Sequence, residues 1–186
     1  MVNEPDETLM LRVGSGDQAA CRQLVERHLG RIVAFAGRVL GDRTMAEDVA
    51  QDVFLRLWSH AQRWQPSGAR LTTWLHRIAL NLCLDWLARR RETPLDEVEE
   101  PVDPQPHATV LLQEQHLSFQ VGKAVAELPD SQRIAITLCY YQGLPNREAA
   151  QMMEISVEAL ESLLARGRRT LKSRLGAVAP DLLGDA

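Results

Sequence analysis

Apolar side chains recur every three or four residues along most of the chain, which is the period of an α-helix. A convincing strand-like alternation of apolar and polar positions is not found. Glycines punctuate the helical pattern, and Pro129 separates two of its segments. The pattern predicts helices over residues 5–14, 17–40, 43–63, 71–91, 109–127, 131–142, 146–153 and 157–175.

One stretch interrupts this pattern and divides the chain. Residues 93–106 contain four prolines and five acidic residues, so they cannot sustain a helix and have little apolar surface to bury. We therefore predict an all-α fold made of two small helical domains joined by a flexible acidic linker. The predicted boundaries are 1–92 for the first domain, 93–118 for the linker, 119–176 for the second domain and 177–186 for a tail.

The charge is distributed unevenly over these parts. The chain has a net charge of −4, but residues 93–126 alone hold six acidic residues and one basic residue. Residues 1–92 carry a net charge of +2 and residues 127–175 a net charge of +1. Local patches decide phosphate contacts, so the acidic total does not exclude a nucleic-acid partner.

Several classes of protein are disfavoured by the sequence. No run of about eighteen apolar residues is present, and the N-terminus is acidic and polar, so we expect no membrane insertion and a cytoplasmic location. Cys21, Cys83 and Cys139 lie inside apolar helical patterns, and we expect buried thiols and no disulfide or metal site. Neither a phosphate-binding glycine loop nor a nucleophile paired with a base is found, so we expect no enzyme activity and no cofactor.

The C-terminal third predicts a helix-turn-helix, a motif that places its second helix in the DNA major groove. A short helix over 146–153 is followed by a break at 154–156 and a long helix from residue 157. Asn146 and Ser156 stand where N-caps are expected. The apolar positions predicted to be buried in the long helix are Val157, Leu160, Leu164 and Leu171. The positions left outward are Ala159, Glu161, Ser162, Ala165, Arg166, Arg168 and Arg169. Ordinary packing of two amphipathic helices remains the alternative.

The helix over residues 44–64 has two contrasting faces. Its apolar stripe, which should face a core, consists of Ala46, Val49, Val53 and Leu57. Its opposite face carries Asp48, Gln51, Asp52, Leu55 and Arg56. An acidic surface around an exposed leucine suits a basic protein partner, whereas the alternative is an ordinary solvated helix face.

The next helix, over 71–91, carries a polar stripe. Its buried side is predicted to hold Leu71, Trp74, Leu75, Ile78 and Leu82. Its other side holds Arg77, Asn81, Asp85 and Arg89 at successive i+4 positions, then Arg90 and Arg91. Arginine binds phosphate and asparagine reads base edges, so the stripe is a candidate nucleic-acid surface. The preceding loop, which contains Trp64 and Arg70, could hold an unstacked base; Trp64 could equally belong to the core.

Taken together, these segments resemble an extracytoplasmic-function (ECF) sigma factor, the small two-domain class of bacterial sigma factor. Residues 46–58 resemble the region 2 helix that grips the β′ clamp helices of RNA polymerase. Residues 71–91 resemble the −10 recognition and melting helix. Residues 128–133, 143–150, 155–157 and 165–169 resemble region 4, the −35 reader.

The resemblance implies roles for individual residues. Binding to the polymerase would involve Asp48, Gln51, Asp52, Phe54 and Leu55. Contacts to the −10 element would involve Trp64, Arg70, Arg77, Asn81, Arg89, Arg90 and Arg91. Contacts to the −35 element would involve Glu161, Ser162, Ala165, Arg166, Arg168 and Arg169. The implied partners of a monomeric chain are core RNA polymerase (β′ clamp helices and β flap), promoter DNA and an anti-sigma factor, in a stress response.

Some residues depart from the family pattern. Glu158 and Glu161 stand where neutral or basic residues are common, Glu154 replaces a common turn glycine, and Gly167 weakens its helix by about 1 kcal/mol relative to alanine. Two other classes therefore stay open. One is a sigma-like decoy that occupies an anti-sigma factor without initiating transcription. The other is an ordinary helix-turn-helix regulator that binds duplex DNA without polymerase.

Overall fold

The computed structural model describes residues 4–65, 70–92 and 120–176, and these residues form helices and no strand. The chain divides into two compact units, Met1–Leu95 and Asp96–Ala186. The predicted all-α fold is confirmed. The predicted linker and tail, and the first part of the predicted helix 109–127, lie outside the described residues.

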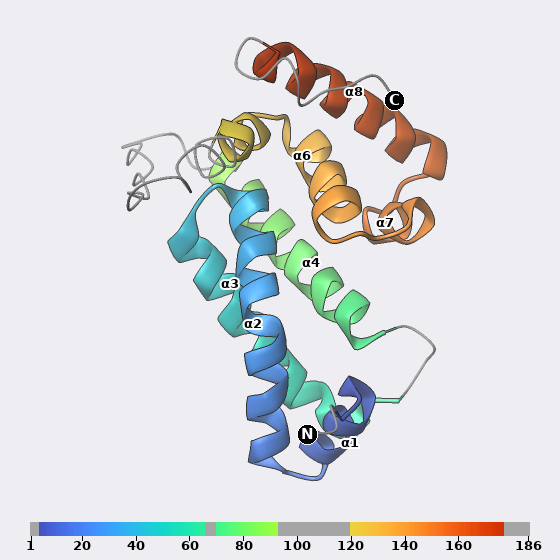
Figure 1. The fold of residues 1–186 in the computed structure, drawn as a ribbon. Helices are drawn as coiled ribbons and strands as arrows, with labels where there is room; N and C mark the ends of the chain where they lie inside the picture. The colour runs from blue at the N-terminus through green and yellow to red at the C-terminus, as the bar shows by residue number, and fades with distance from the viewer. Residues whose placement is uncertain (1–3, 66–69, 93–119, 177–186) are drawn as a thin grey trace, which may run out of the picture. The chain divides into compact units, whose positions relative to one another are not determined.

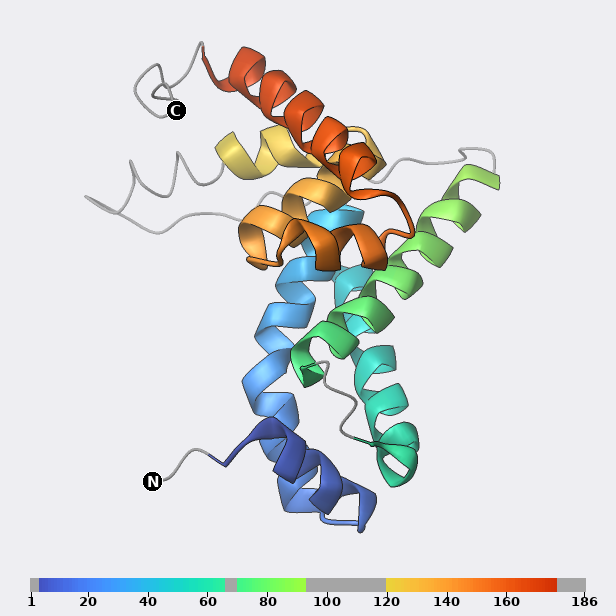
Figure 2. The ribbon, with the colours of Figure 1, turned by 90° about the vertical axis from the view of Figure 1, so that its right-hand side faces the viewer.

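The first unit is built around one long helix. It contains α1 (Asp6–Gly14), α2 (Gln18–Leu40), α3 (Arg43–His60), the 3-10 turn η1 (Ala61–Arg63) and α4 (Leu71–Glu92). As Figures 1 and 2 show, α3 and α4 pack along α2, while α1 lies against the N-terminal end of α2 and beside η1. The predicted helix 43–63 thus ends in a tighter final turn.

Local signals explain where these helices begin and end. The Asp17 carboxylate accepts hydrogen bonds from the backbone N–H of Ala19 and Ala20, at 2.9 and 3.1 Å, and caps α2. Asp42 caps α3 in the same way through the N–H of Met45, at 2.9 Å. Gly41 ends α2 with φ of 71°, a conformation that favours glycine.

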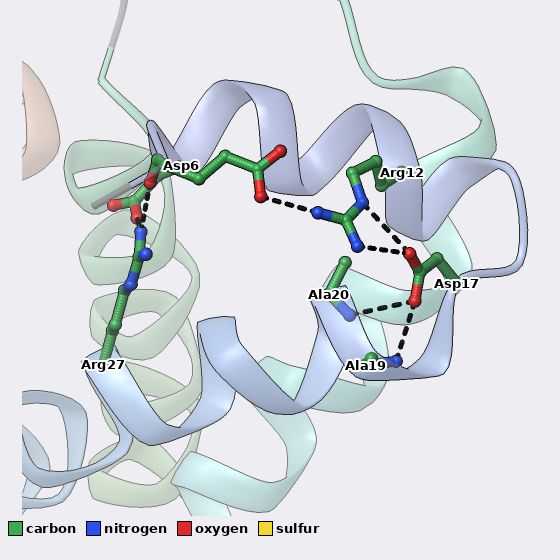
Figure 3. A network of polar contacts seen from close by, with 7 residues as sticks. Asp6, Arg12, Asp17, Ala19, Ala20 and Arg27 are labelled. Carbon is green, nitrogen blue, oxygen red and sulfur yellow. Dashed lines mark hydrogen bonds and ion pairs between the residues drawn. The ribbon is translucent and has the colours of Figure 1, made fainter. Parts of the chain in front are cut away.

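A polar network fastens α1 to α2 (Figure 3). The Arg12 guanidinium donates to Asp17 through Nε and Nη2, at 3.0 and 2.7 Å. Asp6 accepts from Arg27 at 2.9 Å, and its other oxygen lies 2.8 Å from Nε2 of the buried His28. The short α1 is therefore held by directional bonds as well as by its buried apolar side chains.

The core of the first unit matches the predicted stripes in most positions. The stripe of α3 from Ala46 to Leu57 is fully buried. In α4, Leu71, Leu75 and Leu82 are buried as predicted, but Trp74 and Ile78 are only half-buried. Because α4 packs against both α2 and α3, its buried side also includes Ala79, Leu80 and Cys83.

The thiols differ in burial. Cys83 is buried in α4, and this burial raises its pKa to about 12. Cys21 and Cys139 are only half-buried, so the expectation of three buried thiols is wrong for these two. Both lie at the margins of their helices' apolar faces, where the helical period alone does not separate a buried position from a half-buried one.

The second unit combines short helices and a π-helical segment with one long helix. It contains helical residues 120–126, α6 (Asp130–Ile136), the π-helical segment η2 (Thr137–Tyr141), α7 (Asn146–Met152) and α8 (Val157–Leu175). Helix α8 packs against α6 and α7. The predicted helix 131–142 is therefore α-helical over its first two turns and π-helical after them. At the end of the π-helical segment, the Gln142 N–H donates to the carbonyl of Thr137 at 3.1 Å.

The two predicted caps of the helix-turn-helix have different outcomes. Ser156 caps α8, because its hydroxyl accepts from the N–H of Ala159 at 3.1 Å. Asn146 is not a cap: Pro145 occupies that position, and α7 begins at Asn146 itself. Since Pro145 lacks an N–H, it fits a helix entry, and the Asn146 side chain is left for contacts with other elements.

Burial along α8 also differs from the prediction. Leu160 and Leu164 are buried as expected, whereas Val157 and Leu171 are half-buried. Gly167 is buried instead, and a Cβ placed on it would lie 3.1 Å from Cγ1 of Ile136 in α6. Helices α6 and α8 approach each other closely at this glycine. A hydrophobicity scale cannot predict such an approach, because it depends on the absence of a side chain.

Candidate protein and nucleic-acid interfaces

The predicted protein-binding face lies on the solvent side of α3. Asp48, Gln51 and Asp52 are exposed, and Leu55 is 60% exposed in the middle of them. Phe54 does not belong to this face. It is 9% exposed, because it stands one residue after the buried Val53 on the core side, so its assignment to an exposed contact is wrong.

The structure adds one residue that sequence reasoning missed on this face. Trp58 is 44% exposed and lies one turn beyond Leu55 on the same side of α3. The two side chains make an apolar spot bordered by carboxylates. The i+3 spacing from Leu55 was the available signal, but a tryptophan near a helix end reads equally well as core.

The predicted nucleic-acid stripe is exposed from Arg77 to the end of α4. Arg77, Asn81, Asp85 and Arg89 all face solvent, and Arg90 and Arg91 continue the basic surface at the end of the helix. The opposite side of the same helix is buried at Leu75, Ala79 and Cys83. The polar stripe therefore lies opposite the buried side of α4, and the 42%-exposed Leu84 stands among its residues.

The loop before α4 is described at its two ends. Arg70 is exposed directly before the helix, while residues 66–69 lie outside the described part of the chain. Trp64 is half-buried, with its ring edge-on to Trp74 at a centroid distance of 5.3 Å. Trp74 in turn lies 5.8 Å from the ring of His60. Trp64 thus has one side engaged in an aromatic cluster.

The predicted reading face of the second unit lies on α8. The exposed residues among those predicted are Glu161, Ser162, Arg166, Arg168 and Arg169, whereas Ala165 is half-buried. Arg168 donates to the hydroxyl of Tyr140 in η2 at 3.3 Å. This contact and Tyr140 itself were not predicted, because the π segment alters which η2 side chains face α8.

The turn before α8 has an unusual backbone. Glu154 has φ of 56°, the one positive φ at a non-glycine residue in the described ranges. A side chain in this left-handed region is disfavoured, which explains why glycine suits such a turn. The structure therefore gives a physical meaning to the glutamate noted in the sequence.

No helix in the described part of the chain is long and apolar enough to cross a membrane. The structure combines two helical units, each with its own binding surfaces. In the first unit, α3 carries an apolar spot bordered by carboxylates, and α4 carries a polar and basic stripe; the second unit contains a helix-turn-helix. This combination defines a bipartite transcription-factor architecture.

Comparison with known proteins identifies this architecture. The family model described as Sigma-70 region 2 matches residues 24–93, and the one described as Sigma-70, region 4 matches residues 118–171. The ECF RNA polymerase sigma factor SigE of Mycolicibacterium smegmatis is 31% identical over 180 residues, which cover 93% of this chain and 69% of SigE.

Solved structures agree. CnrH, solved in complex with the cytosolic domain of CnrY, superposes with a TM-score of 0.66 at 30% identity, covering 94% of this chain and 99% of CnrH. The sigma factor RpoE of Bartonella quintana, solved with the anti-sigma factor NepR, has the same fold, with a TM-score of 0.66 at 24% identity over 84% of this chain and 97% of that one. The chain belongs to the ECF sigma factors of the sigma-70 family, which is not a class of enzymes.

Proposed function

We propose that this chain directs core RNA polymerase to promoters by using three separate helix faces. The exposed face of α3 binds the polymerase, the stripe of α4 engages the melted −10 strand, and α8 reads the −35 duplex. The chain performs no covalent chemistry and acts in the cytoplasm, where its polymerase and promoter partners are. The observation that carries this proposal is the exposed stripe of α4, in which Arg77, Asn81 and the arginines at the end of the helix lie opposite a buried core.

The α3 face has the composition of a protein-binding site. Leu55 and Trp58 supply apolar area that is buried only when a partner arrives, and tryptophan is enriched among residues that dominate binding energy. Asp48 and Asp52 border this spot and would speed association with a basic surface. The β′ clamp helices are the partner that we assign to this face, and the β flap is the partner that we assign to the second unit.

The α4 stripe suits a single strand. Asn81 offers both a donor and an acceptor to a base edge, and Arg77 lies one turn before it as a phosphate ligand. Removing a base from the stack costs a few kcal/mol, which binding of the extruded base offsets. The aromatic cluster of Trp64 and Trp74 lies at the entry of this helix, where the Trp74 backbone N–H donates to the carbonyl of Arg70 at 3.2 Å.

We also propose control by an anti-sigma factor. RpoE of Bartonella quintana was solved with such a partner, and CnrH was solved with CnrY. An apolar spot such as Leu55 with Trp58, left in water on a free chain, is a suitable target for a competing protein. A stress signal that releases the chain would then expose the polymerase-binding face.

Run-off transcription tests the proposal. Core RNA polymerase with this chain is expected to start at a discrete set of promoters drawn from its genome, and core polymerase alone is not. Leu55→Ala should weaken binding to core at least 10-fold, as loss of a buried interface leucine does. Leu29→Ala, at an exposed leucine of α2, is the matched control and should bind normally.

A second measurement separates melting from polymerase binding. Asn81→Ala should reduce open-complex formation while leaving the affinity for core within about 2-fold, because Asn81 lies on α4 and the polymerase face lies on α3. Equal losses in both assays would contradict this division of roles. Binding to core without any transcript would favour the decoy, and tight specific duplex binding by the free chain would favour an ordinary regulator.

A further inference from the structure

Asn146 makes contacts that its position at a helix start does not require. Its side-chain Oδ1 accepts from the Sγ–H of Cys139 at 3.8 Å, and its Nδ2 donates to Oε1 of Glu161 at 3.4 Å. The thiol on one side and the carboxylate on the other determine which way the amide points, because only the NH₂ group can donate to a carboxylate. One amide therefore links η2, α7 and α8.

These three residues line an open cleft of about 530 Å³ on the second unit. Arg168 lines the same cleft and donates to Tyr140 there. Glu161 is exposed, and within the described residues its hydrogen bond to Asn146 uses Oε1. Its second oxygen, Oε2, is left to accept a hydrogen bond from another molecule.

The place of Glu161 in α8 decides which molecule this is. It is the fifth residue of the second helix of a helix-turn-helix, and the N-terminal residues of such a helix contact base edges in the major groove. A carboxylate accepts hydrogen bonds and cannot donate them, so phosphate oxygens repel it. The donors that the major groove presents are the amino groups of cytosine N4 and adenine N6.

Cytosine fits a carboxylate better than adenine does. Adenine places its N7 acceptor beside N6, and this lone pair repels a second carboxylate oxygen, whereas cytosine presents only a donor. We propose that Glu161, oriented by Asn146, reads the N4 amino group of one cytosine in the −35 element. This inference rests on the proposed function, since it needs α8 to lie in promoter DNA.

The proposal assigns different roles to the two residues. Glu161 contacts the base and determines specificity, and Asn146 is a positioning residue that acts through Glu161. The competing account is that the pair only braces α7 against α8. A brace affects the stability of the second unit equally on all promoters, whereas a base contact affects the preference at a single position.

The test uses holoenzyme assembled from full-length chain and core polymerase, on promoters in which each −35 position is varied to all four bases. Wild-type chain is expected to prefer a cytosine, on one strand at one position, by about 10-fold in transcript yield. Glu161→Gln should reduce this preference to about 2-fold or less and leave the other positions unchanged. Glu158→Gln is the matched control, because this exposed glutamate lies one turn earlier in α8 and its carboxylate is hydrogen-bonded to its own backbone N–H and to Ser156 at the start of that helix.

Asn146→Ala should weaken the preference for cytosine at this one position to a value between those of the wild-type chain and Glu161→Gln. The positioning role is overturned if the cytosine preference of Asn146→Ala equals that of wild type. The base contact is overturned if Glu161→Gln initiates with an unchanged base profile, or if it loses all promoters equally. A wild-type chain that binds no core and gives no transcript would instead contradict the proposed function itself.

Discussion

The two units of this chain reach stability in different ways. In the first unit, three long helices bury continuous apolar stripes, and the exposed faces of α3 and α4 lie opposite that core. In the second unit, the short helices α6 and α7 pack on the long α8, and the structure also uses a π segment, a glutamate with positive φ and a buried arginine. In the first unit, the residues that form the binding surfaces are therefore nearly separate from those that form the core. In the second unit, some residues serve in both.

This difference has a consequence for function. A surface substitution on α3 or α4 changes binding while the core beneath it stays intact. Around α8 the same contacts that hold the helices, such as Arg168 with Tyr140 and Asn146 with Glu161, also lie on the reading face. The four predictions below test this contrast.

The largest effect is expected at Arg133 of α6. This side chain is 7% exposed and donates to the carbonyls of Ala126 and Leu128, both at 3.0 Å, and to Asp130 at 2.6 Å. Arg133→Ala leaves these acceptors unpaired and should cost about 3–5 kcal/mol. Arg12→Ala, at the half-exposed ion pairs with Glu4 and Asp17 in the first unit, should cost less.

The chain carries its own probes for this measurement. All four tryptophans lie in the first unit, and both tyrosines lie in the second. In denaturant titrations, Arg133→Ala should shift the tyrosine absorbance transition and leave the tryptophan fluorescence transition in place. A shift of both transitions would show that the units do not unfold independently.

A close backbone contact in the first unit gives the next largest effect. A Cβ on Gly14 would lie 2.6 Å from the carbonyl oxygen of Ala61, and backbone cannot move aside cheaply. Gly14→Ala should therefore destabilise the first unit by about 1–3 kcal/mol, as overpacking does. Gly30→Ala in α2 has nothing within 4 Å and should stabilise it by up to about 1 kcal/mol. Tryptophan fluorescence compares the two variants; a stabilised Gly14→Ala would refute the contact.

A substitution in the turn before α8 is expected to increase stability. Glu154 has φ of 56°, so Glu154→Gly should remove backbone strain and stabilise the second unit by about 0.5–1 kcal/mol. The same change at Glu148, inside α7, should destabilise it by about 1 kcal/mol. The tyrosine transition measures both, and losses of equal size would show that the left-handed backbone carries no strain.

The smallest effect concerns pH. The pKa of Asp17 is lowered below its usual value, first by the hydrogen bond from Arg12 and then by that from the Ala20 N–H. The pKa of Glu158 is lowered too, first by the hydrogen bond from its own backbone N–H and then by that from Ser156. A carboxyl group whose pKa is lower in the folded protein than in the unfolded chain stabilises the fold at a pH above its pKa in the unfolded chain, about 4. This stabilisation is lost as the pH falls through the pKa of the folded protein. Asp17→Asn should flatten the acid limb of the tryptophan transition, and Glu158→Gln that of the tyrosine transition. An unchanged acid limb in both variants would contradict these assignments.

The site was predictable from sequence to different degrees in the two units. Exposed Asp48, Gln51, Asp52 and Leu55 follow from the period of one long helix, and so does the stripe on α4. Phe54 was misplaced because it lies at the edge of a broad buried face. In the second unit, the cap assigned to Asn146 failed and Tyr140 was missed, because a π turn and a proline entry shift the helical register there.

The sequence by itself determined the helical class, the order and approximate bounds of the helices, and which side of each long helix meets water, because these depend on a local period of apolar residues and on caps a few residues away. Only the tertiary structure decided that Gly167 is a contact point between α6 and α8, that Arg133 is buried with three acceptors, and that Asn146 lies against Glu161. Each of these depends on atoms brought together from distant positions by close packing, and no local pattern encodes that proximity.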